Sequence, residues 1–247
     1  MIKIKGLQKT TLLDYPGKVA AIVFLAGCNF RCPFCHNSDL VLRPETFPEI
    51  KEEDFFIFLK NKSKLLDGIV VTGGEPTLYE DLPAFIKKIK KLGFLIKLDT
   101  NGTNPEMVEY LVKHRLIDYV AMDYKGPLEK YTSYIFPTQN SKLKTQNYNL
   151  KVKKTMESLI RSKLPFEFRT TVVPTLHKRE DLIEMAKQLN NLAMGQSKKI
   201  KWFLQQFRPG QCLDKEFNKI KPCPKSFFEK VLPEIKKLVP ETEVRGI

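Results

Sequence analysis

Short apolar segments alternate with longer amphipathic segments along most of the chain. The apolar segments are often β-branched, which is typical of strands buried on both faces of a parallel sheet. The predicted strands are residues 19–26, 68–72, 95–99, 117–122, 166–173 and 201–206. Helical patterns lie between and after them, at residues 51–65, 82–92, 105–116, 152–162, 179–192 and 225–238.

This alternation predicts an α/β fold with a parallel sheet, right-handed crossovers and helices outside. The number of units is smaller than a closed (β/α)8 barrel needs, so a partial barrel and an open sheet are the two options. We predict a single domain covering residues 1–247. It would have an N-terminal extension over about 1–18, a core over about 19–208 and a C-terminal extension over about 209–247.

The composition is that of an ordinary globular protein, with 42% hydrophobic and 28% charged residues among 247. No apolar stretch approaches the roughly 20 residues of a membrane-spanning helix. The first residues, Met1 to Lys5, lack the apolar core of a signal peptide. We therefore expect a cytoplasmic protein with no membrane partner, in a compartment where thiols stay reduced.

The net charge of +14 arises from 42 Lys and Arg against 28 Asp and Glu. Such a charge is compatible with a nucleic-acid partner. The lysines are spread along helix faces such as residues 87–91, however, and no basic stretch alternates with aromatic residues that would stack on bases. We therefore do not expect nucleic acid to be a partner.

The chemistry of the chain is concentrated in a cysteine motif directly after the first predicted strand. Cys28, Cys32 and Cys35 have the spacing C-x3-C-x2-C. Clustered thiols in a reducing compartment bind metal more often than they form disulfides. A four-iron cluster normally takes four thiolates, so three would leave one iron free to bind another group.

Two further motifs end the second and third predicted strands. Thr-Gly-Gly-Glu-Pro occupies residues 72–76, and Asp-Thr-Asn-Gly occupies residues 99–102. Active sites of parallel α/β folds lie at this edge of the sheet. Gly73 and Gly74 allow close approach to the backbone, and Glu75 suits an ammonium group. Taken singly, both motifs also fit ordinary turns.

In combination, the three motifs resemble the radical S-adenosylmethionine (SAM) superfamily, and the aromatic Phe34 before the third cysteine also fits. Residues 34–37, Phe-Cys-His-Asn, are similar to the glycyl-radical-enzyme activases. Four further segments resemble the branch that activates anaerobic ribonucleoside-triphosphate reductase: residues 14–17, 122–125, 168–174 and 204–209.

The resemblance implies a partial (β/α)6 barrel and a 4Fe-4S cluster on Cys28, Cys32 and Cys35. The open iron would bind the amino and carboxylate groups of SAM. One electron, delivered by an external donor such as flavodoxin or ferredoxin, would yield methionine and a 5′-deoxyadenosyl radical. That radical would remove hydrogen from a glycine of a partner enzyme. The cofactor supplies the difficult chemistry, so the protein needs only to bind and orient.

The resemblance also implies which residues bind SAM. Residues 73–75 would hold the methionine ammonium, and Phe34 would lie beside the adenine. The remaining implied positions are Asp99, Thr100 and Asn101 on the ribose side or at a nearby cation site, Asp123 and Lys125 on the same rim, and Arg169. Arg169 would pair either with the methionine carboxylate or with an internal acid.

Several alternatives remain open. The target is expected to be the class III reductase; pyruvate formate-lyase or another glycyl-radical enzyme is the alternative. A radical SAM enzyme for a small molecule or RNA is a second one. His36 either tunes the cluster or has no such role, and His114 and His177 are expected at the surface. Cys212 and Cys223 have no recognisable metal spacing, so their role is open.

Overall fold

The computed structural model describes residues 2–136, 147–196 and 199–247. The chain separates into two compact units, each with its own internal contacts. The first unit comprises Met1–Asn29 and Asn37–Ala121, and the second comprises Phe30–His36 and Met122–Ile247. We describe each unit by itself, and the single domain stays a prediction.

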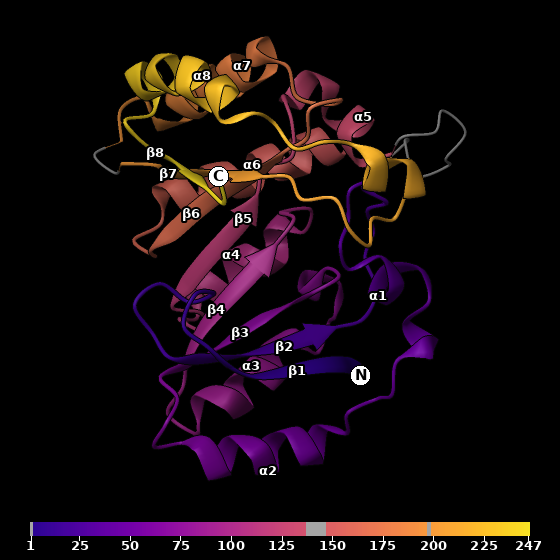
Figure 1. Cartoon of the computed structure of the whole chain (residues 1–247). Helices are drawn as coiled ribbons and strands as arrows, with labels where there is room; N and C mark the ends of the chain where they lie inside the picture. The colour runs from indigo at the N-terminus through magenta and orange to yellow at the C-terminus, as the bar shows by residue number, and fades with distance from the viewer. Residues whose placement is uncertain (1, 137–146, 197–198) are drawn as a thin grey trace. The chain divides into compact units, whose positions relative to one another are not determined.

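The first unit contains strands that are neighbours in chain order (Figure 1). They are β1 (Ile4–Thr11), β2 (Ala20–Leu25), β3 (Gly68–Gly73) and β4 (Leu95–Thr100). β1 is antiparallel to β2, whereas the β2–β3 and β3–β4 pairs are parallel. The helices are α1 (Ser38–Leu42), α2 (Glu52–Lys62), α3 (Leu82–Lys90) and α4 (Pro105–Lys113).

Amphipathic patterning explains these elements. In α3 the buried residues are Leu82, Phe85, Ile86 and Ile89, with lysines between them. α4 begins at the expected position, because the Asn104 side chain accepts a hydrogen bond from the Met107 N–H at 3.2 Å.

The Asp-Tyr-Pro-Gly segment after β1 has a structural role in the first unit. Tyr15 is 4% exposed and packs with Ala20, Ile22 and Val70. A Cβ on Gly68 would lie 2.9 Å from the Tyr15 ring, so β3 begins with the one residue that leaves room for this tyrosine.

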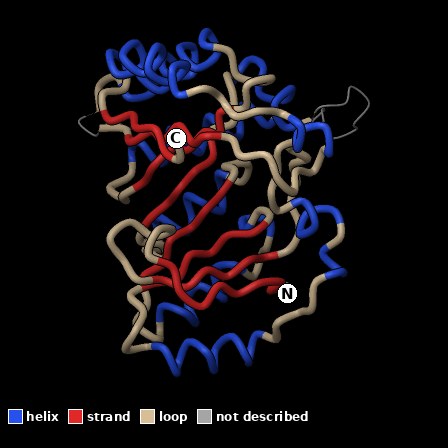
Figure 2. Tube along the Cα trace, in the orientation of Figure 1, coloured by secondary structure: helices blue, strands red, loops and turns tan. Residues whose placement is uncertain are grey.

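The second unit holds three parallel strands, β6 (Phe166–Val172), β7 (Lys201–Gln206) and β8 (Glu241–Arg245). β5 (Tyr119–Asp123) carries the chain across the boundary between the units. The helices are α5 (Tyr131–Ile135), α6 (Tyr148–Arg161), α7 (Arg179–Ala193) and α8 (Lys225–Leu238). α7 and α8 lie side by side next to β8 (Figure 2).

Short 3-10 turns connect some of these elements, at Pro44–Thr46, Pro76–Leu78, Leu128–Lys130 and Lys215–Lys219. No helix among the described residues combines the length and apolarity that crossing a membrane requires. The cytoplasmic location stays a prediction.

The six predicted strands are present with shifts of a few residues, but two further strands were missed. β1 has a mixed pattern with three consecutive exposed residues, and β8 buries only Thr242 fully. Each is the outermost strand of its unit, so one side of its backbone has no neighbouring strand. Such strands lack the continuous apolar run that marks a central strand.

Candidate active site

The cysteine motif spans both units of the chain. Cys28 lies just beyond β2 in the first unit, whereas Cys32 and Cys35 belong to the second. Cys32 is buried, the other two are partly exposed, and all three are free of disulfides. The Cys35 N–H donates to the Cys32 carbonyl at 3.1 Å, which makes a tight turn between these two thiols.

Thiols of this type and number suit an iron–sulfur cluster with an open iron. The described residues hold no group of three Cys, His, Asp or Glu side chains around a single metal-ion position. The assignment of Cys28, Cys32 and Cys35 to a cluster therefore stays a prediction.

The paired glycines at the end of β3 allow the chain to lie directly on the segment that leads to Cys28. A Cβ would lie 2.3 Å from the Leu25 carbonyl oxygen if placed on Gly73, and 1.8 Å from the Gly27 oxygen if placed on Gly74. Gly73 also has a φ of +122°, which favours glycine. Any side chain at either position would push the two strand ends apart.

Glu75 is fully buried between the ends of β3 and β4. Its Oε1 accepts hydrogen bonds from the Thr77 N–H at 3.0 Å, the Thr77 hydroxyl and the Thr100 hydroxyl at 2.8 Å. Its Oε2 accepts one, from the Asn101 N–H at 2.6 Å. Burial raises the pKa of Glu75, and these donors oppose the rise. Oε2 keeps capacity for a further donor, because a carboxylate oxygen accepts more than one hydrogen bond.

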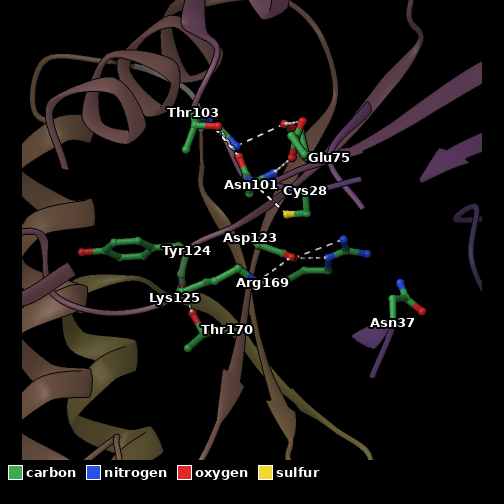
Figure 3. Close-up of polar contacts among 12 residues, drawn as sticks. Cys28, Asn37, Glu75, Asn101, Thr103, Asp123, Tyr124, Lys125, Arg169 and Thr170 are labelled. Carbon is green, nitrogen blue, oxygen red and sulfur yellow. Dashed lines mark hydrogen bonds and ion pairs between the residues drawn. The ribbon is translucent and has the colours of Figure 1, made fainter. Parts of the chain in front are cut away.

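Asn101 joins Cys28 to this arrangement (Figure 3). Its Nδ2 lies 2.8 Å from Asn29 Oδ1 and 3.8 Å from Cys28 Sγ. Its Oδ1 accepts from the Thr103 N–H at 3.0 Å and the Thr103 hydroxyl at 2.7 Å. The predicted ribose-side residue therefore contacts a predicted cluster ligand, and its ribose role stays a prediction.

Asp99 is paired with a lysine that the sequence analysis did not single out. Lys97 is 1% exposed, and its ammonium binds the Asp99 carboxylate. The two side chains share a face of β4 because they are two residues apart. The role of Asp99 on the ribose side or at a cation site remains a prediction. In either role, Asp99 would bind the ligand while paired with Lys97.

In the second unit, one carboxylate lies between two cations (Figure 3). Asp123 is 3.0 Å from Lys125 Nζ and 3.2 Å from Arg169 Nε. Burial raises the pKa of Asp123, but the two cations outweigh burial and lower it. Burial lowers the pKa of Lys125, yet Asp123 and Cys32 raise it overall. These three side chains sum to a charge of +1. Arg169 pairs with an internal acid here, and its pairing with the methionine carboxylate stays a prediction.

Phe34 is 6% exposed, and Lys125 Nζ lies 5.8 Å from the centre of its ring. This is the geometry of a cation–π contact. Lys125 therefore joins the ion pair to the aromatic residue of the cysteine motif. The adenine contact of Phe34 stays a prediction.

The surface location predicted for His177 is wrong. His177 is 1% exposed, its Nδ1 accepts from the Val173 N–H at 3.0 Å, and its Nε2 lies 2.9 Å from the Lys125 carbonyl oxygen. A backbone N–H only donates and a carbonyl only accepts, so the neutral ring has its proton on Nε2. Burial lowers the pKa of His177 to about 4. His114 is exposed, as predicted.

Four other residues with polar side chains or thiols have no direct part in the arrangements described above. His36 contacts the backbone oxygen of Arg208 at 2.8 Å, and its cluster-tuning role stays a prediction. Gln206 donates to the Cys223 carbonyl at 2.6 Å. Cys212 and Cys223 are buried free thiols, and burial raises the pKa of both, so neither is an activated nucleophile.

Several contributing residues were missed because their importance depends on tertiary contacts. Asn37, for example, donates to the Gly73 carbonyl at 2.9 Å. A local signal was available for two others. Thr77 and Thr103 each lie two residues after Glu75 and Asn101, the spacing at which a side chain captures a backbone N–H in a turn.

Comparisons with known proteins agree with these features. The radical SAM superfamily model matches residues 22–189. A putative glycyl-radical enzyme activating enzyme of Methanocaldococcus jannaschii is 35% identical over 99% of this chain and 96% of that protein. A pyruvate formate-lyase-activating enzyme of Streptococcus mutans is 31% identical over 77% of this chain and 74% of that protein.

A solved structure supports the fold. Streptococcus suis SuiB bound to S-adenosylmethionine superposes with a TM-score of 0.61 at 15% identity. The match covers 89% of this chain, which spans about half of SuiB, 48%. At this identity the likeness concerns the fold alone.

The chain belongs to the radical SAM superfamily and, within it, to the glycyl-radical-enzyme activating enzymes. It is an enzyme with an α/β radical SAM fold and a mainly parallel sheet, as predicted. Membership of this family implies SAM and a 4Fe-4S cluster as cofactors and a protein as the partner.

Proposed function

We propose that this protein activates an anaerobic ribonucleoside-triphosphate reductase by generating a glycyl radical on it. The observation that carries the chemistry is the cysteine motif of Cys28, Cys32 and Cys35, none of which forms a disulfide, with the base of the loop packed on Gly73 and Gly74. These thiolates would ligate a 4Fe-4S cluster. The bound cluster would supply one-electron cleavage of SAM.

Glu75 is the proposed site for the methionine ammonium. Within the described part of the chain, its buried carboxylate has neutral hydrogen-bond donors and no cationic partner, and Oε2 accepts only one of these bonds. A cationic ligand would relieve the cost of burying this charge. The ligand's ammonium group therefore matches both the hydrogen-bonding capacity and the charge of Glu75.

Lys125 and Arg169 are the proposed attraction for the methionine carboxylate. Both cations contact the same acid, Asp123, and these three side chains sum to a charge of +1. Both side chains are 16% exposed, which limits solvent screening. A planar guanidinium also fits a carboxylate well.

The reductase is favoured as target by the segments at 14–17, 122–125, 168–174 and 204–209. Two of these segments contain Asp123, Lys125 and Arg169. They therefore supply charged groups of the candidate site in addition to strand residues of the fold. Pyruvate formate-lyase is the second candidate, and the Streptococcus mutans relative supports it. The electron donor is proposed to be an external flavodoxin or ferredoxin, because Cys212 and Cys223 alone are too few thiolates for a second cluster.

The experiment begins with anaerobic reconstitution, which should give about four irons per chain. Reduced protein should then cleave SAM to 5′-deoxyadenosine. Zinc in place of iron, or intact SAM after reduction, would contradict the proposed chemistry.

The target is tested by mixing the reduced holoenzyme and SAM with purified class III reductase or with pyruvate formate-lyase. Electron paramagnetic resonance should show a glycyl doublet with the reductase and a much weaker one with the lyase. The reverse preference would make the lyase the target and leave the radical chemistry intact.

A further inference from the structure

A predicted cluster ligand has a carboxamide donor aimed at its sulfur. Asn101 Nδ2 lies 3.8 Å from Cys28 Sγ, within the first unit of the chain. The same nitrogen donates to Asn29 Oδ1 at 2.8 Å. The amide nitrogen of Asn101 therefore lies within reach of one oxygen and one sulfur, which are 3.9 Å apart.

The orientation of this carboxamide is determined by its neighbours. Asn101 Oδ1 faces the backbone N–H of Thr103 at 3.0 Å, and a backbone N–H only donates. Exchanging the oxygen and nitrogen of Asn101 would place two donors against each other. The nitrogen must therefore be the atom that points toward Cys28.

The side chain is also held in place. Asn101 is 5% exposed, and its own N–H donates to the buried Glu75 carboxylate at 2.6 Å. Asn29 Nδ2 donates to the Thr103 hydroxyl at 2.8 Å, which in turn donates to Asn101 Oδ1 at 2.7 Å. These bonds close a ring of Asn29, Thr103 and Asn101, so the donor cannot swing away from the sulfur without breaking several of them.

We propose that Asn101 donates an N–H···S hydrogen bond to the Cys28 thiolate and thereby raises the reduction potential of the cluster. This inference rests on the proposed function only in taking Cys28 as a cluster ligand. Reduction adds negative charge to the cluster and its sulfurs, and a donor stabilises the more negative state more strongly. Hydrogen bonds to the sulfurs are among the factors that set cluster potentials. Asn101 is then a positioning residue for electron uptake.

The test is an electron-paramagnetic-resonance redox titration of reconstituted holoenzyme without SAM. Asn101→Leu retains similar volume but has no donor. We expect this variant to hold about four irons. At a fixed potential its ratio of reduced to oxidised cluster should be about tenfold lower than in the unmodified protein, which corresponds to a reduction potential lower by about 59 mV for one electron. Asn101→Asp, which keeps the shape and the acceptor for Thr103, should shift the potential in the same direction.

Asn61→Leu is the matched control, because Asn61 is an exposed asparagine on α2 of the same unit, outside the cysteine motif and the strand-end motifs. Its potential should equal that of the unmodified protein. An unchanged potential in either Asn101 variant would overturn the inference. Failure of both variants to hold iron would also overturn it, because a tuning bond is dispensable for assembly. Absence of a cluster in the unmodified protein would instead overturn the proposed function.

Discussion

Two carboxylates, one in each unit, are stabilised in opposite ways. Glu75 in the first unit is fully buried and bound by hydroxyl and backbone N–H donors, and burial raises its pKa. Asp123 in the second unit is 32% exposed, and Lys125 and Arg169 lower its pKa. Neutral donors therefore stabilise Glu75, whereas two cations stabilise Asp123.

The two environments attract different ligand groups. The negative charge of Glu75 suits a cation, and the two cations beside Asp123 suit an anion. SAM carries both kinds of group on its methionine end. The first unit therefore has a charge that suits the ammonium group of an amino acid, and the second unit has charges that suit its carboxylate.

The largest expected effect tests whether the thiols of both units serve one cluster. Cys28→Ala in the first unit and Cys32→Ala in the second should each abolish the cluster, because two remaining thiolates are too few. Iron analysis and the visible absorption of the reconstituted protein measure this. Cys212→Ala, which removes a buried thiol outside the motif, should keep about four irons. Retention of the cluster by Cys28→Ala or Cys32→Ala would show that the substituted cysteine is not a cluster ligand.

The next effect is a loss of stability at low pH caused by His177, which contacts the backbone of Lys125 in the second unit. Burial lowers the folded-state pKa of His177 to about 4, from its ordinary value of 6.5. The unfolded chain therefore binds more protons between these values, so stability present above pH 6.5 should be lost as the pH falls toward 4. The total is about 3 kcal/mol. Around the ring lie the Lys125 carbonyl, the Tyr134 ring and Asp181.

Urea unfolding at pH 7 and at pH 4.5 measures this loss. His177→Gln keeps one donor and one acceptor but does not titrate, so its stability should change less between the two values. His114→Gln, at an exposed position, should behave like the unmodified protein. An equal pH dependence of His177→Gln and the unmodified protein would contradict the assignment.

Removal of the uncompensated charge in the first unit should have a smaller effect. Glu75→Gln preserves the shape and one acceptor oxygen, but it lacks the charge that a ligand ammonium needs. We expect SAM binding to weaken by about 2 kcal/mol, roughly thirtyfold. Calorimetric titration of the oxidised holoenzyme measures the affinity. Glu80→Gln, on an exposed neighbour, is the control, and equal affinities would remove Glu75 from the ammonium site.

The smallest expected effect is the loss of SAM affinity when Arg169 in the second unit is replaced. Arg169→Gln would remove one of the two cations beside Asp123 and leave Lys125 in place. SAM affinity should fall by about 1 kcal/mol, roughly fivefold, because Lys125 still attracts the carboxylate. Arg161→Gln, an exposed arginine on α6, should bind SAM normally. Tighter binding by Arg169→Gln would contradict the charge argument.

Much of the fold and the position of the site were predictable from local pattern. The central strands were found because burial on both faces requires continuous apolar runs. The motifs at 28–35, 72–76 and 99–102 were found because chemistry gathers where parallel strands end. β1 and β8 were missed because a strand with one neighbour tolerates a mixed pattern.

The partners of the charged and polar groups were not predictable. His177 is buried because it joins Val173 to the backbone of Lys125, which lies 52 positions earlier in the chain. Lys97 is buried because Asp99 neutralises it. A single sequence shows neither contact, since local pattern reports which residue types occur but not which distant groups satisfy them.

The amino-acid sequence alone specifies which reactive groups the protein has: three clustered thiols, a flexible glycine pair and an acid. It also places them at the ends of strands whose continuous apolar segments predict a parallel sheet. Only the tertiary structure decided how each charge is compensated and that Asn101 points its donor toward Cys28. The physical reason is that hydrogen bonds and ion pairs depend on distance and direction between atoms that folding brings together. The hydrophobic pattern that drives folding carries no direction of its own.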